Sequence, residues 1–187
     1  MCGIAGFACR AAAKSDLAVL RSMADAIAHR GPDDEGYFEA QSRSGKYKVG
    51  LAHRRLSIID LDENRAKQPF VSKDGNLLLA HNGEFYDYQR IRARLTADEA
   101  RFRTKSDSEI ILHLYPRMGI NGTLKHLRGE FAFSLYDQQQ DTLHLVRDRF
   151  GIKPLYWTQV NGKVIFGSEL KVLFAHPDVV PEFTSEG

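Results

Sequence analysis

The sequence has 187 residues, of which 43% are hydrophobic and 27% are charged, and its formal net charge is +2 at pH 7. This composition fits one folded domain with a substantial core, and the balanced charge excludes the large basic field typical of nucleic-acid-binding proteins. The two cysteines, Cys2 and Cys9, are too few for a disulfide framework and fit a reducing compartment.

Targeting and membrane segments are not predicted. The apolar run at residues 3–9 has no basic region before it and is interrupted by Arg10, which argues against a secretion signal. No stretch reaches the length that a bilayer-spanning helix needs. We therefore expect a cytoplasmic protein that binds neither membranes nor nucleic acid.

The first half of the chain predicts short strands and one helix. Ser15 or Asp16 can serve as the N-cap of that helix, which ends at the turn cluster His29-Arg30-Gly31-Pro32. Asp74-Gly75 is a typical hairpin turn. The other expected segments are strands at 2–8, 36–40 and 47–59, a polar loop at 60–69, and a hairpin of 70–71 with 77–81.

The second half predicts helices followed by hairpins. Ser106 and Glu109 have the spacing of a capping box, and the helix that they open should bury Met118 and end before Asn121-Gly122. Asn161-Gly162 is a preferred two-residue hairpin turn. The other expected segments are helices at 86–95 and 168–175 and strands at 102–104, 129–137, 142–148, 155–160 and 163–167.

The order of these segments predicts the fold class. Strands and helices fall in separate runs, and many connections are short enough for hairpins, which predicts an α+β fold with helices on the outer faces of antiparallel sheets. The pattern does not set the number of sheets.

Cys2 is the first candidate catalytic residue. A small residue at position 2 allows removal of Met1, which would leave a thiol and a free α-amine on the same residue. That amine has an ordinary pKa of about 7.7–8.0 and can act as a base near neutral pH. A buried cysteine in a first strand is the commoner explanation of Cys2 alone; the rest of the chain favours catalysis.

Three further positions fit a thiol that attacks a carbonyl. Asn82-Gly83 offers two donors to a developing oxyanion, although a turn after a strand explains the pair equally well. Strand alternation places Arg54 and Arg55 on opposite faces, so one can be solvated while the other binds a carboxylate. Asp107, in the first turn of a capped helix, either complements the helix dipole or receives an ammonium group. Arg55 and Asp107 together would bind both charged ends of an α-amino acid.

The sequence gives little support for a metal site, a phosphate-binding loop or a serine hydrolase triad. The seven histidines are dispersed, so no metal site is expected, and there is no glycine-rich phosphate loop. Ser57 with His53 and Asp60 imitates a hydrolase triad but lacks the nucleophile-elbow context.

Short motifs in a fixed order extend from residue 1 to about residue 176. They are Met1-Cys2-Gly3-Ile4-Ala5-Gly6, His29-Arg30-Gly31-Pro32-Asp33, Ala52-His53-Arg54-Arg55-Leu56-Ser57-Ile58, Asn82-Gly83-Glu84, Ser106-Asp107-Ser108-Glu109, Gly129-Glu130-Phe131-Ala132-Phe133, Arg147-Asp148-Arg149-Phe150-Gly151 and Ser168-Glu169-Leu170-Lys171. Together they resemble the glutaminase domain of class II glutamine amidotransferases, in particular that of glutamine-hydrolysing asparagine synthetases.

The resemblance implies a fold and a domain plan. The fold is that of the N-terminal-nucleophile hydrolases, a four-layer αββα sandwich of two antiparallel sheets. Residues 1–176 would form the glutaminase domain and residues 177–187 the start of a linker to an ATP-dependent synthetase domain, whose Ser-Gly-Gly motif is absent here. We expect no cofactor in the glutaminase domain, and ATP and Mg²⁺ only in the synthetase domain. The chain would be a fragment, which the abrupt end at 183–187 favours, or a stand-alone subunit.

The resemblance also implies an activity. Cys2 would attack the side-chain amide of glutamine, release ammonia and form a γ-glutamyl thioester that water hydrolyses to glutamate. The Arg30-Gly31-Pro32 loop would close over the pocket. The implied catalytic residues are Cys2, Asn82 and Gly83, the last two as the oxyanion hole; the implied substrate-binding residues are Arg55 for the α-carboxylate, Asp107 and Glu84 for the α-amine, and Leu56, Ser57, Ile58, Ile59, Asn82 and Gly83 along the pocket.

The use of the ammonia stays open at this point. Synthesis of asparagine from aspartate, in cis or in trans, is the first hypothesis. The same half-reaction could serve another acceptor, as in secondary-metabolite or polysaccharide amidotransferases. A non-catalytic glutamine-binding module would result if Met1 stays attached. The sequence sets no oligomeric state, and a homodimer is compatible with it.

Overall fold

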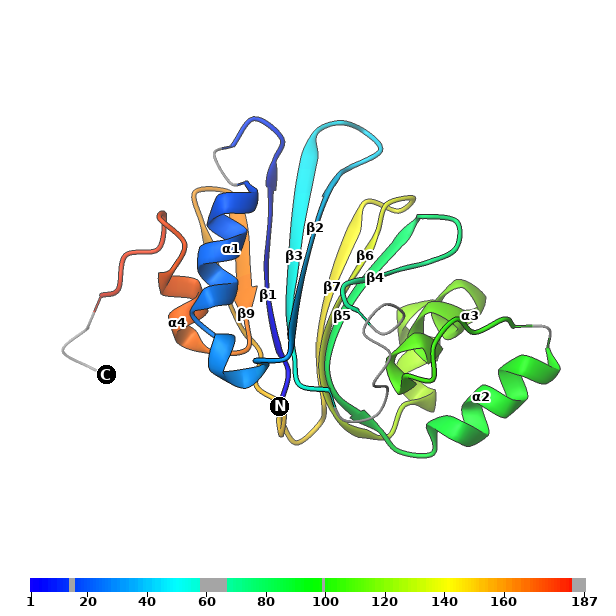
Figure 1. Cartoon of the computed structure of the whole chain (residues 1–187). Helices are drawn as coiled ribbons and strands as arrows, with labels where there is room; N and C mark the ends of the chain where they lie inside the picture. Colours follow the sequence, from blue (N-terminus) through cyan, green and yellow to red (C-terminus); the bar gives the residue numbers. More distant parts are fainter. Residues whose placement is uncertain (14–15, 58–66, 99, 183–187) are drawn as a thin grey trace.

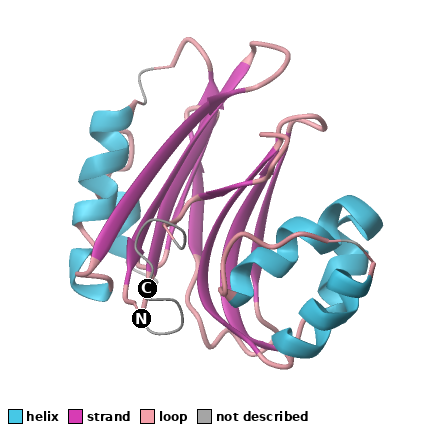
Figure 2. Cartoon of the chain, turned by 45° about the vertical axis from the view of Figure 1, so that its right-hand side comes forward, coloured by secondary structure: helices cyan, strands magenta, loops and turns pink. Residues whose placement is uncertain are grey.

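The computed structural model describes residues 1–13, 16–57, 67–98 and 100–182. Two antiparallel sheets lie face to face, with helices α1 and α4 outside one sheet and α2 and α3 outside the other (Figure 1). Each sheet is therefore covered on both faces, as Figure 2 shows from a second direction. The predicted α+β class and the αββα layering are confirmed.

The first sheet has five strands in the order β2-β3-β1-β9-β8. Its central strand is the first of the chain, so the N-terminus begins in the middle of a sheet. Gly6 allows this close packing, because a Cβ atom there would lie 2.5 Å from the Gly50 carbonyl oxygen. The strands are β1 (Gly3–Arg10), β2 (Asp34–Gln41), β3 (Tyr47–Arg55), β8 (Tyr156–Val160) and β9 (Lys163–Gly167).

The second sheet has four strands in the order β4-β5-β6-β7. Its edge strand β4 is short and pairs only with Leu78 and Leu79 of β5. Beyond that pairing, β5 has an edge that no further strand among the described residues covers. The strands are β4 (Phe70–Val71), β5 (Leu77–Phe85), β6 (Gly129–Asp137) and β7 (Thr142–Arg147).

The helices complete the outer layers. Helix α1 begins after Asp16, whose side chain accepts hydrogen bonds from the N–H groups of Ala18 and Val19. One-turn 3-10 helices at Ala28–Arg30 and Asp107–Glu109 precede β2 and α3. The α-helices are α1 (Leu17–Asp25), α2 (Tyr88–Ala97), α3 (Ile110–His126) and α4 (Leu170–Phe174). None of the described helices has the length and apolar character needed to cross a bilayer.

Apolar side chains fill the three spaces between the four layers. Leu20, Met23 and Ile165 pack between α1 and the first sheet. Alternate residues of β1 and β3, such as Ile4 and Leu51, point between the sheets. A third cluster joins the second sheet to α3. Residues 2, 4, 53 and 55 therefore belong to the same inner face as this central core.

Both the start and the end of the capped helix differ from the prediction. Ser106 accepts a hydrogen bond from the Ser108 N–H, but Glu109 does not return the bond as in a capping box. Its carboxylate accepts the N–H groups of Arg103 and Thr104, which fixes 102–104 as a loop rather than the predicted strand. Helix α3 also continues past residue 121, across a break at Gly119 (φ 65°), and Met118, which was expected to be buried, is exposed.

Two strand boundaries also differ. The predicted strand 47–59 ends at Arg55, and residues 58–66 lie outside the described part of the chain. Strand β5 was expected to end at residue 81 but continues to Phe85. Asn82-Gly83 is therefore inside a strand and is not a turn. The proposed linker at 177–187 is described only to residue 182, and its Val179 packs against the core under α1.

Candidate active site

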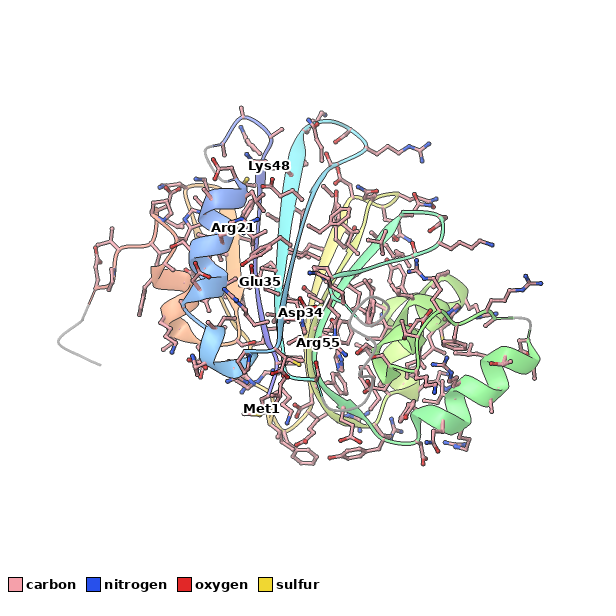
Figure 3. The ribbon with its side chains drawn as sticks, in the orientation of Figure 1. Met1, Arg21, Asp34, Glu35, Lys48 and Arg55 are labelled. Atoms are coloured by element: carbon pink, nitrogen blue, oxygen red, sulfur yellow. The ribbon has the colours of Figure 1, made fainter. Side chains whose placement is uncertain are left out.

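A cavity of about 370 Å³ opens at the end of the sandwich where the chain begins. Figure 3 shows Met1 and Arg55 at this end, with Arg55 between the two sheets. The start of β1 and the end of β3 form one wall, and the end of β5, the start of β6 and the 3-10 helix before α3 form the other. The lining residues from the predicted set are Cys2, Arg55, Leu56, Asn82, Gly83, Glu84 and Asp107.

Three predicted binding residues are not part of this lining. Ser57 lies beside the cavity, where its N–H donates to Asp33 Oδ2 at 2.7 Å. Ile58 and Ile59 lie outside the described residues.

The Leu56 backbone and the Arg30 side chain hold Cys2 at its thiol and at its carbonyl group. Its Sγ donates to the Leu56 carbonyl oxygen at 3.7 Å and accepts from the Leu56 N–H at 3.4 Å. Its carbonyl oxygen accepts from Arg30 Nε at 2.9 Å. Because β1 begins only at Gly3, opposite Arg54, these contacts replace the strand ladder at Cys2.

The electrostatics around Cys2 keep its thiol protonated, so the reaction needs a base. Burial raises the pKa of the Cys2 thiol above its ordinary value, and the Leu56 N–H, the chain terminus, Arg55 and Arg30 oppose this rise only in part. The thiol is therefore protonated at neutral pH. Attack by Cys2 then needs a nearby group that accepts its proton.

The two arginines at the end of β3 face opposite sides, as the alternation predicts. Arg54 points outward, contacts Asp25 and Glu35, and is ion-paired instead of freely solvated. Arg55 is buried on the inner face and lines the cavity. The Arg55 side chain therefore lies on the same side of the sheet as Cys2.

Asn82 and Gly83 come from the opposite sheet. Asn82 is 1% exposed, and its Nδ2 has no hydrogen-bond partner among the described residues. A buried amide donor without a partner is costly unless a ligand completes it. Gly83 has φ 143°, and a Cβ atom there would lie 2.1 Å from the Glu130 carbonyl oxygen, so only glycine fits.

The open edge of β5 directs further donors into the same region. The His81 N–H donates to Gln68 Oε1 at 2.7 Å, and the Phe85 N–H donates to Asp107 Oδ2 at 2.8 Å. Strand alternation places the Gly83 N–H on that edge, between these two donors. The side chain of Asn82 and the backbone of Gly83 therefore converge on one cavity.

Asp107 is a buried carboxylate in the wall of the cavity. It is 3% exposed, and burial raises its pKa, while the N–H groups of Phe85 and Ser108 oppose the rise. It forms no salt bridge within the described part of the chain. Because an ionised carboxylate is costly to bury without a cation, this position favours a bound ammonium group.

Two pairs of residues that the sequence reasoning missed also line the cavity, together with Met1, Gln68 and Ser106. Lys153 Nζ lies 3.0 Å from Glu130 Oε1 at the cavity and contacts Met1 Sδ at 3.7 Å. His81 Nδ1 lies 2.7 Å from Ser108 Oγ, and burial lowers the pKa of His81 to about 3, so its ring is neutral. The resembling motifs contained Glu130 and Ser108, but motif matching assigned no role to them.

Asp148 orders the loop that carries Lys153. Its carboxylate accepts the N–H groups of Phe131, Phe150, Ile152 and Lys153. This is a physical role for the motif at residues 147–151, for which spacing alone gave no function.

The structure also places the loop that was expected to close over the pocket and the triad that the sequence analysis set aside. The Arg30-Gly31-Pro32 loop does not line the cavity, because Gly31 packs against the Arg54 backbone and Arg30 holds Cys2. Of the imitation triad, Asp60 is not described, and His53 Nε2 bonds to the His81 carbonyl oxygen at 3.0 Å. Among the described residues, no group of three or more side chains is arranged to hold a metal ion.

Comparison with known proteins gives a family. The family model described as "Glutamine amidotransferase domain" matches residues 1–187. The chain belongs to the glutamine amidotransferase family. It is 44% identical, over 98% of its length, to asparagine synthetase [glutamine-hydrolyzing] 2 of Bacillus subtilis, and 38% identical over 91% to asparagine synthetase B of Escherichia coli. It is also 42% identical over 94% to amidase chry2 of Gibberella zeae.

The chain spans only about a quarter of these relatives, 23% of the B. subtilis protein, 30% of the E. coli protein and 26% of the amidase. Among solved structures, the fold is similar to that of the glutamine phosphoribosylpyrophosphate amidotransferase of B. subtilis. The TM-score is 0.74 at 19% identity, over 92% of this chain and 43% of that one. The predicted family and N-terminal-nucleophile hydrolase fold are confirmed, and the enzyme class is that of glutamine amidotransferases.

Proposed function

We propose that this domain hydrolyses glutamine to glutamate and ammonia through a thioester on Cys2. The observation that carries the proposal is the convergence of three groups on one cavity: the half-buried Cys2 thiol, an amide donor of Asn82 without a partner among the described residues, and the buried Asp107 carboxylate. Membership in the glutamine amidotransferase family supports the choice of glutamine.

The reaction begins with removal of Met1, which frees the α-amine of Cys2. That amine takes the thiol proton, and Sγ attacks the side-chain amide carbon of glutamine. The developing oxyanion receives hydrogen bonds from Asn82 Nδ2 and the Gly83 N–H. The tetrahedral intermediate expels ammonia, which leaves with a proton from the amine, and water then releases glutamate from the thioester.

The cavity binds the amino-acid end of glutamine by charge. Arg55 pairs with the α-carboxylate, and Asp107, with Glu84 beside it on the wall, receives the α-ammonium. The backbone at Leu56 and Ser57 lies along the substrate. The two opposite charges set the orientation in which the amide reaches Cys2.

We propose further that the ammonia serves ATP-dependent synthesis of asparagine from aspartate, by a synthetase portion in cis or in trans. ATP and Mg²⁺ would belong to that portion and no cofactor to this domain. The asparagine synthetases among the relatives support this acceptor. The amidase among them favours the second candidate, transfer of ammonia to another acceptor.

A glutaminase assay tests the first proposal. We expect the protein to release glutamate and ammonia in equal amounts from glutamine, and Cys2→Ala to abolish this release. Cys9→Ala is the matched control, since Cys9 lies in the core under α1, away from the cavity. Intact mass shows whether Met1 is absent. A trimmed, folded protein that releases no ammonia would overturn the proposal.

A further inference from the structure

Glu169, which follows β9, is connected to Cys2 through the side chain of Arg30. Glu169 precedes helix α4 but forms no capping hydrogen bond there. Its carboxylate points instead to Arg30, with Oε1 3.0 Å from Arg30 Nη1. Arg30 in turn donates from Nε to the Cys2 carbonyl oxygen at 2.9 Å.

The guanidinium of Arg30 depends on this carboxylate. Its side chain is 9% exposed, and its Nη2 has no hydrogen-bond partner among the described residues. Since a buried cation needs a counter-charge, removal of Glu169 would leave Arg30 without a stable position. His29 Nε2 and Lys171 Nζ also contact Glu169, at 2.9 Å and 3.0 Å, and orient the carboxylate.

The neighbouring Ser168 fixes the same segment of β1. Its Oγ accepts the Ile4 N–H at 2.9 Å, and its own N–H donates to the Ile4 carbonyl oxygen at 2.9 Å. Arg30 also passes over Gly3, where a Cβ atom would lie 3.5 Å from Arg30 Cδ. Residues 2–4 are therefore held from the side of β9 and α4, while Leu56 holds the thiol from the side of β3.

We propose that Glu169 is a positioning residue for the reaction of Cys2. Acting through Arg30, it fixes the Cys2 backbone so that the thiol and the freed α-amine stay aligned with the substrate amide. The proposal rests on the function proposed above. It adds that the start of α4, which does not line the cavity, contributes to the rate of attack rather than to substrate binding.

The chain offers a closely matched control for Glu169. Asp178 pairs with Lys163 at the other end of β9, at 2.6 Å. The exposed fractions of the side chains are 25% for Asp178 and 8% for Lys163, against 25% for Glu169 and 9% for Arg30. Asp178→Asn and Glu169→Gln therefore remove equal charge from similarly buried ion pairs, and only Glu169 is connected to Cys2.

The test compares these variants in glutamine hydrolysis. We expect Glu169→Gln to lower kcat about 10- to 100-fold, because small misplacement of a reacting group has such an effect. KM should stay within about twofold, since Arg55 and Asp107 are untouched. Asp178→Asn should keep kcat near that of the wild type. Equal kcat values for the two variants would overturn the proposal.

A double variant shows whether Glu169 acts through Arg30. If it does, Arg30→Ala with Glu169→Gln should be no slower than Arg30→Ala alone, within about twofold. Independent effects would multiply instead, and that result would contradict the proposed path.

A measurement without turnover separates this inference from the proposed function. Hydrogen exchange of the N-terminal peptide, residues 2–10, should be faster in Glu169→Gln than in Asp178→Asn. If the wild type hydrolyses no glutamine, the proposed function fails, and this comparison still decides whether Glu169 holds the N-terminus. Identical exchange in both variants would overturn the inference.

Discussion

Cys2 on one wall of the cavity and Asn82 with Asp107 on the other differ in how far the protein supplies their hydrogen-bond and charge partners. On the wall from the first sheet, Cys2 has partners at its thiol and its carbonyl oxygen, from Leu56 and Arg30. On the wall from the second sheet, Asn82 Nδ2 has no partner among the described residues, and Asp107 has no salt bridge there. The protein thus fixes the attacking group and leaves the receiving groups to a ligand, which is the arrangement that preorganised catalysis requires.

The base on the first wall can be removed while the thiol is kept. An extra alanine between Met1 and Cys2 converts the α-amine of Cys2 into an amide nitrogen. We expect glutamine hydrolysis to fall about 10²- to 10⁴-fold, because a positioned base has that effect on rate. The measurement is ammonia release, with intact mass to verify the new terminus. Unchanged activity would show that the α-amine is not the base.

The second wall is tested first at Asn82. Asn82→Ala removes one oxyanion donor, so we expect kcat to fall about 10²- to 10³-fold with a smaller change in KM. Steady-state kinetics on glutamine give both values. The core below should tolerate the change, since Asn82 Nδ2 bonds to no described residue. An increase in KM alone would place Asn82 in binding instead of in stabilising the oxyanion.

Asp107 should act on binding instead of rate. Asp107→Asn keeps the size of the side chain but loses the charge for the substrate ammonium, so we expect KM to rise about 10- to 100-fold. Ser57→Ala, whose side chain does not line the cavity, should raise KM far less. Equal, small increases in KM from the two changes would show that Asp107 only stabilises the start of the helix.

Asp107→Asn should also stabilise the protein in the absence of glutamine. Burial raises the pKa of Asp107 above its unfolded value of about 3.9, so the folded state binds this proton more tightly. Its contribution to stability is therefore highest at low pH and is lost as pH rises through the folded pKa. Asp107→Asn should raise Tm at pH 7, by roughly 2–4 °C for each kcal/mol recovered. This increase in Tm should shrink toward pH 4. A variant with a lower Tm than the wild type at pH 7 would contradict the prediction.

The difference between the walls also separates what the sequence predicted from what it did not. Cys2, Asn82 and Asp107 stand in short motifs with clear chemistry, and the αββα fold followed from their resemblance. The partners of Cys2 were harder to find. A backbone contact such as that from Leu56 leaves no mark in residue type, and the Arg30–Glu169 contact joins residues 139 positions apart.

Local pattern also failed in two segments of the chain. Residues 102–104 read as a strand, but Glu109 takes up their N–H groups. Spacing left a turn open as one explanation of Asn82-Gly83 and ended the strand at residue 81, although the pair lies inside β5 and is paired with β6. Both errors come from interactions between segments, which the spacing of apolar residues does not record.

The most direct test of the central claim is the mass of the protein after exposure to a glutamine analogue whose side-chain amide is replaced by a diazoketone. An electrophile at that position should alkylate the residue that attacks the amide. The account predicts one adduct per chain, on Cys2 of protein that lacks Met1, prevented by excess glutamine and absent from Cys2→Ala. An unmodified Cys2 in trimmed, folded protein, or labelling that glutamine does not prevent, would contradict it.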